Sequence, residues 1–416
     1  FEAPGGGSAA ADRLPRLRTA MARAGLDGFL IPRADAHQGE YVPPRDERLA
    51  YMTGFTGSAG SAVVLAERAA LFVDGRYTIQ AADQTDGALF EITRLHETPP
   101  SKWLARAVTA GATIGYDPWL HGRIEIDKLA AALAEKNAEL RPVATNPVDE
   151  IWTDQPAPPS APIRVHPTSL SGRTSTEKRA DLAAALAADG VAAAILSLPD
   201  SIAWLLNIRG SDIARNPVPL AFAILYNNGK LTLFADAAQI DNAVAAHLGP
   251  EVERRDKTEV LPSLKQFTSQ RIRLDRGTCP MAIAQALEEA GVQIDWGEDP
   301  CIMPKARKTD AEIAGARTAH IRDGAAMARF LRWFDDHAPK GELRETEIVK
   351  RLEEERRATN QLLDISFDTI AGSGPHGAIV HYRVSENTDR TLQPGELMLV
   401  DSGGQYQDGT TDITRT

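Results

Sequence analysis

The sequence predicts a fold of mixed α/β and α+β class, in which two copies of one α/β module precede a block that carries a sheet on helices. Three observations predict it. Two seams divide the 416 residues into three blocks, the first two blocks repeat the same landmarks, and the third has a different composition. A chain of this length exceeds what one hydrophobic core usually organises. Several domains are therefore expected.

The two seams are a proline-rich segment and a basic segment. DQPAPPSAP at 154–162 holds four prolines in nine residues, which excludes both helix interior and central strand. In MPKARKTDAEI at 303–313, basic residues precede Thr309, a candidate N-cap with Glu312 three residues later. We expect domains at 11–153, 163–303 and 306–416, and a long helix from Thr309 to about Phe334.

The first two blocks share a series of landmarks. Each begins with a helix that has one apolar face, ends at a glycine and is followed by a short apolar strand. The paired landmarks are the helix up to Gly25 with GFLIP and the helix up to Gly190 with AAAILSLP, then YMTGFTGS at 51–58 with WLLNIRGS at 204–211, and LFVD at 71–74 with LFAD at 233–236. The last two pairs of segments lie beyond the helix and strand, and they favour a true duplication of one module.

The third block changes character after the long helix. A Glu- and Arg-rich segment at 343–358 precedes SFDTIAGSGPHGAIVHY, in which short apolar runs alternate with Gly and Pro. The segment GELMLVDSGGQYQDGTTDITRT predicts two strands and a turn, with Leu397–Val400 in the first strand and Ile413 in the second. No helix is expected after residue 358.

Composition excludes several classes of function. With 46 basic and 57 acidic residues the net charge is −11, which opposes non-specific attraction to nucleic acid or anionic lipid. The two cysteines, Cys279 and Cys301, cannot build a disulfide framework or a cysteine zinc site, and a reducing compartment fits them. The apolar stretches are shorter than a bilayer span, and the first ten residues lack the regions of a signal peptide. We expect neither a nucleic-acid nor a membrane partner.

Common catalytic signatures do not occur, and two histidines stand out. The sequence holds no HExxH, no Walker A loop and no GxSxG, and GFTGSAGS predicts a tight turn before the strand SAVVLA. His376 and His381 flank a glycine-rich turn and the apolar run GAIV. If 377–381 is extended, the His381 ring can point into a cleft. A structural role stays open for either histidine.

Asp401 and Asp412 lie inside predicted strands, where aspartate is normally depleted. If the hairpin centres between Tyr406 and Gln407, the two residues lie directly opposite, with Cβ atoms roughly 4.5–5.5 Å apart. Two carboxylates that close repel by about 4 kcal/mol at an effective dielectric near 20. A divalent metal ion between them would remove this repulsion.

Two alternatives remain for this pair. Asp408-Gly409 is a strong two-residue turn signal, and a turn there would place Gln405 opposite Asp412. The two aspartates could also be exposed carboxylates of a capped turn.

The residues GAIVHY, followed by LVDSGGQYQDGTTDITRT, resemble the catalytic domain of the aminopeptidase P family, the Xaa-Pro aminopeptidases of the creatinase, prolidase and methionine aminopeptidase superfamily. TGFTGSAGSAVV, DGRYTIQAA and IAWLLNIRGSDIARNPV extend the resemblance to the long, three-domain type. It implies two creatinase-like N-terminal α/β domains followed by the first half of a pita-bread catalytic domain.

The resemblance also implies a site. Asp401 and Asp412 match two ligands of a pair of divalent metal ions, with Mn²⁺ as the expected metal. His381 matches a catalytic histidine that contacts the substrate, and Arg76 matches a substrate-binding arginine, with a turn-stabilising surface arginine as its alternative. A further His and two Glu ligands are expected in motifs beyond Thr416, so we expect the 416-residue chain alone to be inactive.

The implied activity is metal-dependent release of the N-terminal residue from peptides with proline in the second position, by a cytoplasmic homodimer. One alternative is a prolidase restricted to Xaa-Pro dipeptides, against which the three-block layout argues. Another is a non-catalytic pita-bread module that binds peptides or histones. Retention of both Asp401 and Asp412 argues against the second alternative.

Overall fold

The structure is a computed structural model that describes residues 9–416. It separates into two compact units. The larger unit extends to Val165 and resumes at Thr174–Arg307, and the C-terminal unit contains His166–Arg173 and Lys308–Thr416. Within the larger unit we call residues 9–151 module I, and residues 174–306 together with the strand Arg164–Val165 module II.

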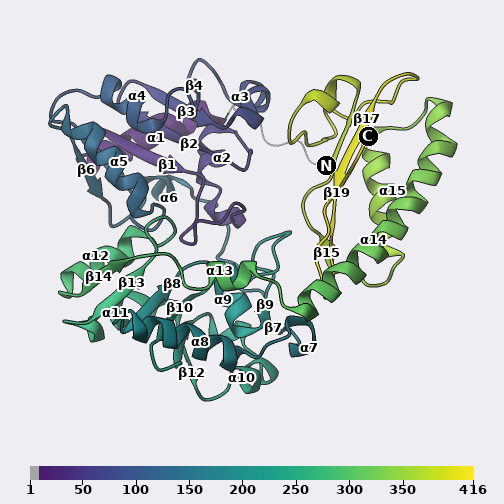
Figure 1. The fold of residues 1–416 in the computed structure, drawn as a ribbon. Helices are drawn as coiled ribbons and strands as arrows, with labels where there is room; N and C mark the ends of the chain where they lie inside the picture. The colour runs from purple at the N-terminus through teal and green to yellow at the C-terminus, as the bar shows by residue number, and fades with distance from the viewer. Residues whose placement is uncertain (1–8) are drawn as a thin grey trace. The chain divides into compact units, whose positions relative to one another are not determined.

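Module I is a six-stranded mixed sheet with helices on both faces (Figure 1). Its elements are α1 (Ala10–Arg23), β1 (Gly28–Pro32), α2 (Arg48–Thr53), β2 (Gly60–Leu65), β3 (Ala69–Val73), α3 (Thr78–Gln84), β4 (Glu91–Arg94), α4 (Pro100–Ala107), β5 (Thr113–Tyr116), α5 (Arg123–Ala134), β6 (Glu139–Pro142) and α6 (Pro147–Ile151), with 3₁₀ turns at Pro44–Asp46 and Gly75–Tyr77. The glycine-rich segment before β2, predicted as a tight turn, is irregular and has a bend at Ser58 and Ala59 directly before the strand.

Module II has the same plan. Its elements are β7 (Arg164–Val165), α8 (Ser175–Ala188), β8 (Ala193–Leu196), α9 (Pro199–Leu206), β9 (Ile208–Arg209), β10 (Phe222–Tyr226), β11 (Leu231–Phe234), α10 (Asn242–Leu248), β12 (Val252–Arg255), α11 (Val260–Leu264), β13 (Arg271–Leu274), α12 (Met281–Glu289), β14 (Gln293–Trp296) and α13 (Ile302–Ala306), with 3₁₀ turns at Ala237–Gln239, Lys257–Glu259 and Lys265–Phe267.

The two sheets confirm the predicted duplication. Module I has the strand order β4-β3-β2-β1-β5-β6, and module II has β12-β11-β10-β8-β13-β14. The central strand β1 pairs antiparallel with β2 and parallel with β5, and β8 pairs antiparallel with β10 and parallel with β13. Equivalent strands therefore have the same neighbours in the same directions.

Equivalent loops of the two modules bind each other. Ile124 and Ala282 are the second residues of α5 and α12, and Pro118 and Arg276 are the second residues after β5 and β13. The Ile124 N–H donates to the Arg276 carbonyl at 3.2 Å, and the Ala282 N–H donates to the Pro118 carbonyl at 2.9 Å. Each hydrogen bond joins positions equivalent to those of the other, with the two modules interchanged. The junction therefore has approximate twofold symmetry.

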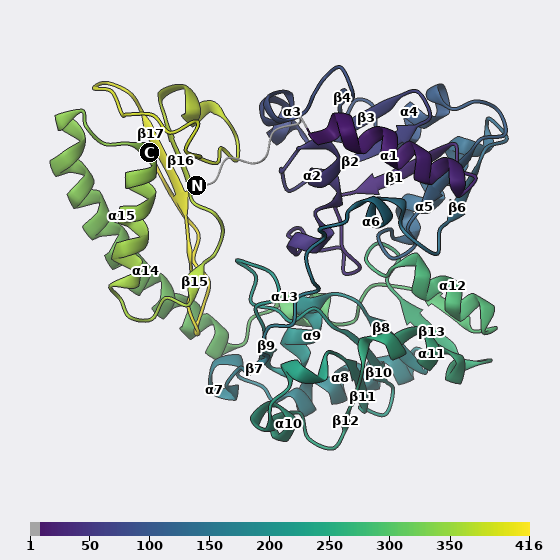
Figure 2. The same ribbon diagram turned by 180° about the vertical axis from the view of Figure 1, so that it is seen from behind.

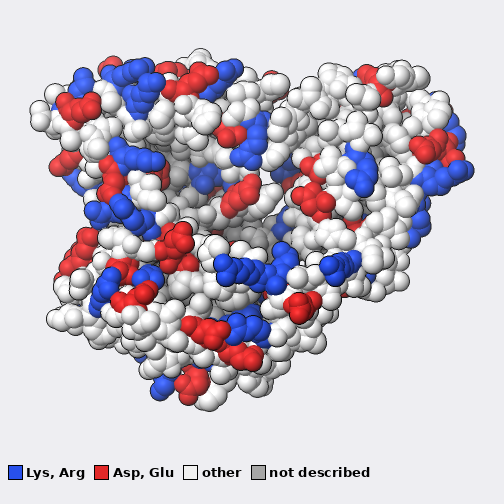
Figure 3. Space-filling view, viewed as in Figure 1, with Lys and Arg blue, Asp and Glu red and all other residues white. Residues whose placement is uncertain are grey.

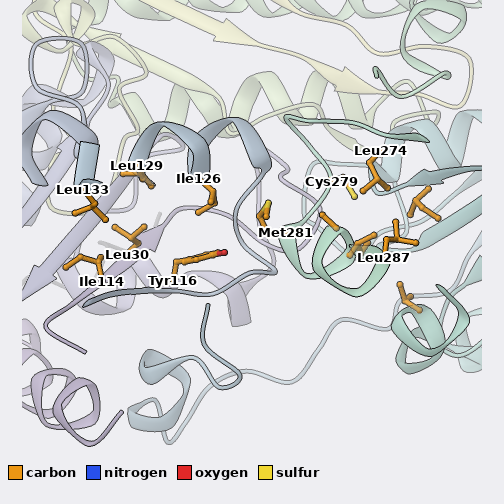
Figure 4. Close-up of a cluster of buried hydrophobic side chains, with 14 of the residues drawn as sticks. Leu30, Ile114, Tyr116, Ile126, Leu129, Leu133, Leu274, Cys279, Met281 and Leu287 are labelled. Carbon is orange, nitrogen blue, oxygen red and sulfur yellow. The ribbon is translucent and has the colours of Figure 1, made fainter. Parts of the chain in front are cut away.

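One buried cluster continues across this junction (Figure 4). Gly122 and Pro280, the equivalent residues that precede α5 and α12, form an antiparallel bridge at its centre. A Cβ at Gly122 would lie 2.3 Å from the Gly277 carbonyl oxygen, so this close approach requires glycine. The cluster includes Tyr116 of module I and Met281 of module II. The two modules therefore share part of their core.

The C-terminal unit packs two helices beside a small sheet (Figures 1 and 2). Its elements are α7 (Thr168–Ser171), α14 (Asp310–His337), a 3₁₀ turn at Ala338–Lys340, α15 (Glu345–Arg357), β15 (Asp364–Ile365), β16 (Ile370–Ser373), a 3₁₀ turn at Gly374–Ala378, β17 (Met398–Ser402), β18 (Gly404–Gln405) and β19 (Ile413–Arg415). Strands β16, β17 and β19 form one antiparallel sheet and β15 pairs with β18.

The sequence located most of these elements. Thr309 caps α14 in a reciprocal capping box with Glu312, as predicted, and the helix continues three residues past Phe334. The two predicted strands at the end of the chain are β17 and β19. Among the described residues after 358, the helical content is the 3₁₀ turn at Gly374–Ala378.

The prediction of an extended segment at 377–381 is wrong. Residues Gly374–Ala378 form the 3₁₀ turn, and His381 has a left-handed backbone with φ of 56° and an exposed side chain. The cause lies in the preceding residues, because Gly374 has φ of 51° and Pro375 has the fixed φ that suits the start of a helical turn.

The described residues contain no helix that is both long and apolar enough to cross a membrane. Cys279 and Cys301 are free and buried, in agreement with the expected lack of a disulfide framework. Basic and acidic side chains are interspersed on the face shown in Figure 3.

Candidate functional site

The hairpin β17–β19 carries both predicted metal ligands, in a register that the sequence did not predict. Asp401 pairs with Thr414, and the Tyr406 N–H donates to the Gly409 carbonyl at 2.9 Å, so the turn centres on Gln407 and Asp408. The register that places Asp401 opposite Asp412 is therefore wrong. The alternative with Gln405 opposite Asp412 is also wrong, because Gln405 bridges Thr410.

Contacts with α14 explain this register. The two terminal guanidinium nitrogens of Arg322, Nη1 and Nη2, donate to the two carboxylate oxygens of Asp408 at 2.9 and 2.8 Å. Gly409 lies so close to the helix that a Cβ there would be 3.1 Å from the Cα of Ala316. These tertiary contacts hold the turn in place and outweigh the local preference of Asp408-Gly409 for the two central positions.

The two carboxylates are diagonal neighbours on one face of the hairpin. Asp412 is two residues from Thr414, the partner of Asp401, so its side chain leaves the same face. Thr414 donates its hydroxyl to Asp401 at 2.8 Å, and the two carboxyl groups lie within hydrogen-bonding reach of each other. Partial desolvation raises the pKa of Asp412, although the residue is exposed, and the charge of Asp401 raises this pKa further.

This arrangement fits a divalent cation. Two neighbouring carboxylates repel each other and are stabilised by a positive charge between them, and carboxylate oxygens are ligands that Mg²⁺, Ca²⁺ and Mn²⁺ favour. Asp401 and Asp412 supply two such groups. Residues 9–416 contain no group of three or more His, Cys, Asp or Glu side chains placed to hold a metal. The hairpin therefore offers two carboxylates on one face, fewer than such a group needs.

The two histidines of the glycine-rich segment have different surroundings. His381 is exposed, at the left-handed position before Tyr382. The Nδ1 of His376 lies 2.9 Å from both carboxylate oxygens of Glu345, and its ring packs on Tyr382 with centroids 4.3 Å apart. His376 is thus held by a structural contact, which the sequence left open.

Sequence reasoning missed Glu345. It is fully buried in the first turn of α15 and accepts hydrogen bonds from the Ser373 amide and hydroxyl and from the Tyr382 hydroxyl, at 2.8 to 3.0 Å, besides its contact with His376. Burial raises the pKa of Tyr382, so the phenol stays protonated and can donate. Glu345 thereby fixes both ends of the segment that carries His381.

Arg76 lies in module I, in the 3₁₀ turn after β3. Asp74 caps that turn by accepting from the Arg76 backbone N–H at 3.0 Å, and the guanidinium Nε donates to the same carboxylate at 2.7 Å. In module II, Asp236 caps the equivalent turn by accepting from the Ala238 N–H. Because that turn forms with alanine at the position of Arg76, the guanidinium is not needed to make it.

Family models divide the chain into three matched segments. Residues 13–151 and residues 154–312 each match a Creatinase/Prolidase N-terminal domain, and residues 314–416 match Metallopeptidase family M24. The chain thus has two creatinase-type N-terminal domains followed by an M24 domain.

Longer relatives match over almost the whole chain. A probable Xaa-Pro aminopeptidase P of Coccidioides posadasii is 37% identical over 420 residues, which cover 97% of this chain and 68% of the relative. The chain belongs to the Xaa-Pro aminopeptidase P family. Another member, from Aspergillus fumigatus, is 37% identical over 97% of the chain, and the chain spans 64% of its length.

A solved structure of the family agrees in fold. The X-prolyl aminopeptidase of Caenorhabditis elegans, described as a cytosolic enzyme with a di-nuclear active site, matches with a TM-score of 0.91 and 30% identity. The match covers 98% of this chain and 69% of that one. The chain thus spans about two thirds of the length of these relatives.

Proposed function

We propose that the full-length protein removes the N-terminal residue from peptides that have proline in the second position. Membership of the Xaa-Pro aminopeptidase P family supports the reaction. The observation that carries the proposal is the pair Asp401 and Asp412, diagonal on one face of a hairpin inside the segment that matches the M24 metallopeptidases.

Within this proposal, Asp401 and Asp412 hold two divalent metal ions, expected to be Mn²⁺, together with ligands from the rest of the protein. Bound ions of this kind supply Lewis-acid polarisation of the scissile carbonyl. The Thr414 hydroxyl donates to Asp401, and this hydrogen bond fixes the orientation of the Asp401 carboxylate. Asp412 is exposed and therefore accessible to an incoming ion.

His381 and Arg76 are proposed to contact the substrate. His381 presents an exposed imidazole from a segment that Glu345 fixes at both ends, so the ring can donate to or accept from a peptide group. Arg76 keeps guanidinium nitrogens beyond the Nε that binds Asp74, and its turn does not need them. They suit a carbonyl or carboxylate of a peptide.

Cleavage of paired tripeptides tests the reaction. Full-length protein with Mn²⁺ should cleave Arg-Pro-Pro and leave Arg-Ala-Ala largely intact, and chelation should stop the cleavage. Equal cleavage of both peptides would refute the proline requirement. Asp412→Asn should abolish activity and lower the bound metal, whereas Asp336→Asn, at an exposed aspartate of α14 paired with Arg332, should retain the metal.

The same assay separates the alternatives. A prolidase would cleave Gly-Pro faster than any longer peptide. A non-catalytic binding module would contain no bound metal in the full-length protein and would cleave neither tripeptide. The two retained carboxylates on one face favour the enzyme over such a module.

We also propose the domain division 11–153, 163–303 and 306–416, which the three family-model segments support. A homodimer and a cytoplasmic location are proposed on the resemblance to the family, and the cytosolic description of the C. elegans enzyme supports the location. Sedimentation of the full-length protein would test the dimer.

A further inference from the structure

A buried ion pair lies behind the hairpin that carries Asp401 and Asp412. Asp323 of α14 and Arg356 of α15 are both 0% exposed. The guanidinium binds both carboxylate oxygens, with Nε–Oδ1 at 2.7 Å and Nη2–Oδ2 at 3.1 Å. Neither α14 nor α15 carries a residue that the family resemblance assigns to the site.

Each member of the pair reaches a residue adjacent to one of the two aspartates. The Nη2 of Arg356 donates to the Ser402 hydroxyl at 3.1 Å, and Ser402 follows Asp401. Thr411 precedes Asp412, and its buried hydroxyl lies near enough to Asp323 to lower the pKa of that carboxylate, while it accepts a hydrogen bond from the Gly404 N–H at 2.9 Å. A third contact comes from the turn of the hairpin, where the Tyr406 hydroxyl donates to Asp323 at 2.6 Å.

Strand geometry separates the two sets of side chains. Successive residues of a strand point to opposite faces, so Ser402 and Thr411 face the helices when Asp401 and Asp412 face away from them. Burial agrees, since Ser402 is 0% and Thr411 1% exposed, whereas Asp401 is half-buried and Asp412 exposed. The ion pair therefore holds the hairpin from the face opposite to the carboxylates.

A buried ion pair usually contributes little to the net free energy of folding. Desolvation of two ions often cancels their attraction, and apolar residues of similar volume can replace a buried ion pair at little cost or with a gain in stability. Here burial acts to raise the pKa of Asp323, but hydrogen bonds from Arg356, Tyr406 and Thr411 keep it below its ordinary value. The carboxylate thus stays charged and keeps all its donors, as a directional support requires.

We propose that the Asp323–Arg356 pair is a positioning device, which sets the distance between Asp401 and Asp412 through Ser402 and Thr411 and thereby the metal affinity of the site. The inference rests on the proposed function for the role of the two aspartates. Residues that orient metal ligands in this way typically change metal affinity by about 10- to 100-fold when they are removed.

The main test replaces the network by apolar side chains of similar size. The full-length variant with Asp323→Leu, Arg356→Met, Tyr406→Phe and Ser402→Ala should unfold at a temperature close to that of the wild type, because the Ser402 hydroxyl that Arg356 bound is removed with the network. Its Mn²⁺ affinity, measured by calorimetry, should fall by about 10- to 100-fold. Thr411→Val and Ser402→Ala, which leave the ion pair in place, should each give a smaller loss of the same kind.

An ion pair of module I with a buried arginine and a half-buried aspartate provides the control. Arg48 binds Asp149 through two nitrogens, at 2.7 and 2.9 Å, and its side chain is 7% exposed. Because Arg48 also binds Asp46, the control is Arg48→Met with Asp46→Leu and Asp149→Leu, which removes an ion-pair network from the other compact unit. It should leave the Mn²⁺ affinity at the wild-type value.

Hydrogen exchange of the metal-free protein provides a readout that needs neither metal nor activity. The Thr411 N–H donates to the Gly404 carbonyl at 2.9 Å, and this pairing should lose protection in the Thr411→Val and apolar variants but not in the Arg48 control. Wild-type Mn²⁺ affinity in both the apolar and the Thr411→Val variants would overturn the positioning role. Failure of the proposed function would instead appear in the wild type, as metal binding without cleavage of Arg-Pro-Pro.

Discussion

Gly315 of α14 lies against Asp408 of the hairpin turn, at a distance that leaves no room for a side chain. A Cβ at position 315 would be 2.4 Å from the Asp408 carbonyl oxygen, which is backbone and cannot rotate away. The next residue of the turn, Gly409, also lies against α14, where an added Cβ would be 3.1 Å from the Cα of Ala316. The position of the hairpin on the helix is therefore set by backbone contacts.

Gly315→Ala should destabilise the C-terminal unit, although alanine is the better helix former. The clash should cost about 1–3 kcal/mol, more than the gain of about 1 kcal/mol in helix propensity. Gly324→Ala in the same helix is the control, because nothing lies within 4 Å of its Cβ position, and it should be neutral or stabilising. Urea unfolding of the two variants tests the prediction, and equal effects would contradict it.

Glu345→Gln should loosen the segment that carries His381. The Ser373 N–H and the Ser373 and Tyr382 hydroxyls all donate to this carboxylate, and an amide offers one acceptor oxygen where the carboxylate offers two. We expect a loss of about 1–3 kcal/mol in unfolding free energy and, in the full-length protein, a lower kcat with little change in KM. Glu353→Gln in the same helix, paired with an exposed Arg357, should change neither.

Arg76→Ala should separate substrate binding from turn stability. Because module II makes the equivalent turn with Ala238, we expect the melting temperature to stay unchanged and the KM of the full-length protein to rise. Asp74→Ala and Asp236→Ala each remove a cap and should each cost about 1 kcal/mol. A loss of stability in Arg76→Ala equal to that of Asp74→Ala would assign the guanidinium to the turn.

Acid should weaken the junction of the two modules through His37. This buried histidine binds the Ser197 carbonyl at 3.0 Å and stacks on Phe222 of module II. Burial lowers the pKa of His37, with opposing contributions from Asp35 and Asp212 and a lowering one from Lys257. The neutral ring is favoured in the folded state, so its contribution is present above pH 6.5, the ordinary pKa, and is lost as the pH falls toward the folded pKa.

Hydrogen exchange at about pH 7.5 and pH 5.5, corrected for intrinsic rates, should show reduced protection at the junction at the lower pH. His37→Gln should remove this difference, and His320→Gln on the exposed side of α14 should retain it. A junction with equal protection at both pH values in the wild type would contradict the role of His37.

The sequence was sufficient for the elements and their repetition, because these depend on local patterns. Apolar periodicity, caps and terminating glycines predicted the two modules and the capped start of α14. The same patterns identified Asp401 and Asp412 as unusual strand residues on a shared hairpin. Resemblance then supplied the proposed roles of His381 and Arg76.

The geometry of the site could not be predicted in the same way. The hairpin register depends on Arg322 and Gly315, which are more than eighty residues away from the turn. Glu345 has no local signal, since an acidic residue in the first turn of a helix is common and its burial appears only with the fold. The hairpin register and the burial of Glu345 therefore depend on long-range contacts, which local sequence preferences do not reveal.

The paired loops between the modules have the form of an isologous interface, in which each partner offers the same surface to the other. Here both partners belong to one chain, and the bridge between Gly122 and Pro280 lies on the approximate axis. A single module with this loop would present a self-complementary face to a second copy of itself. Because one chain supplies both halves, this contact does not depend on protein concentration, and only module I carries an arginine in the equivalent turn.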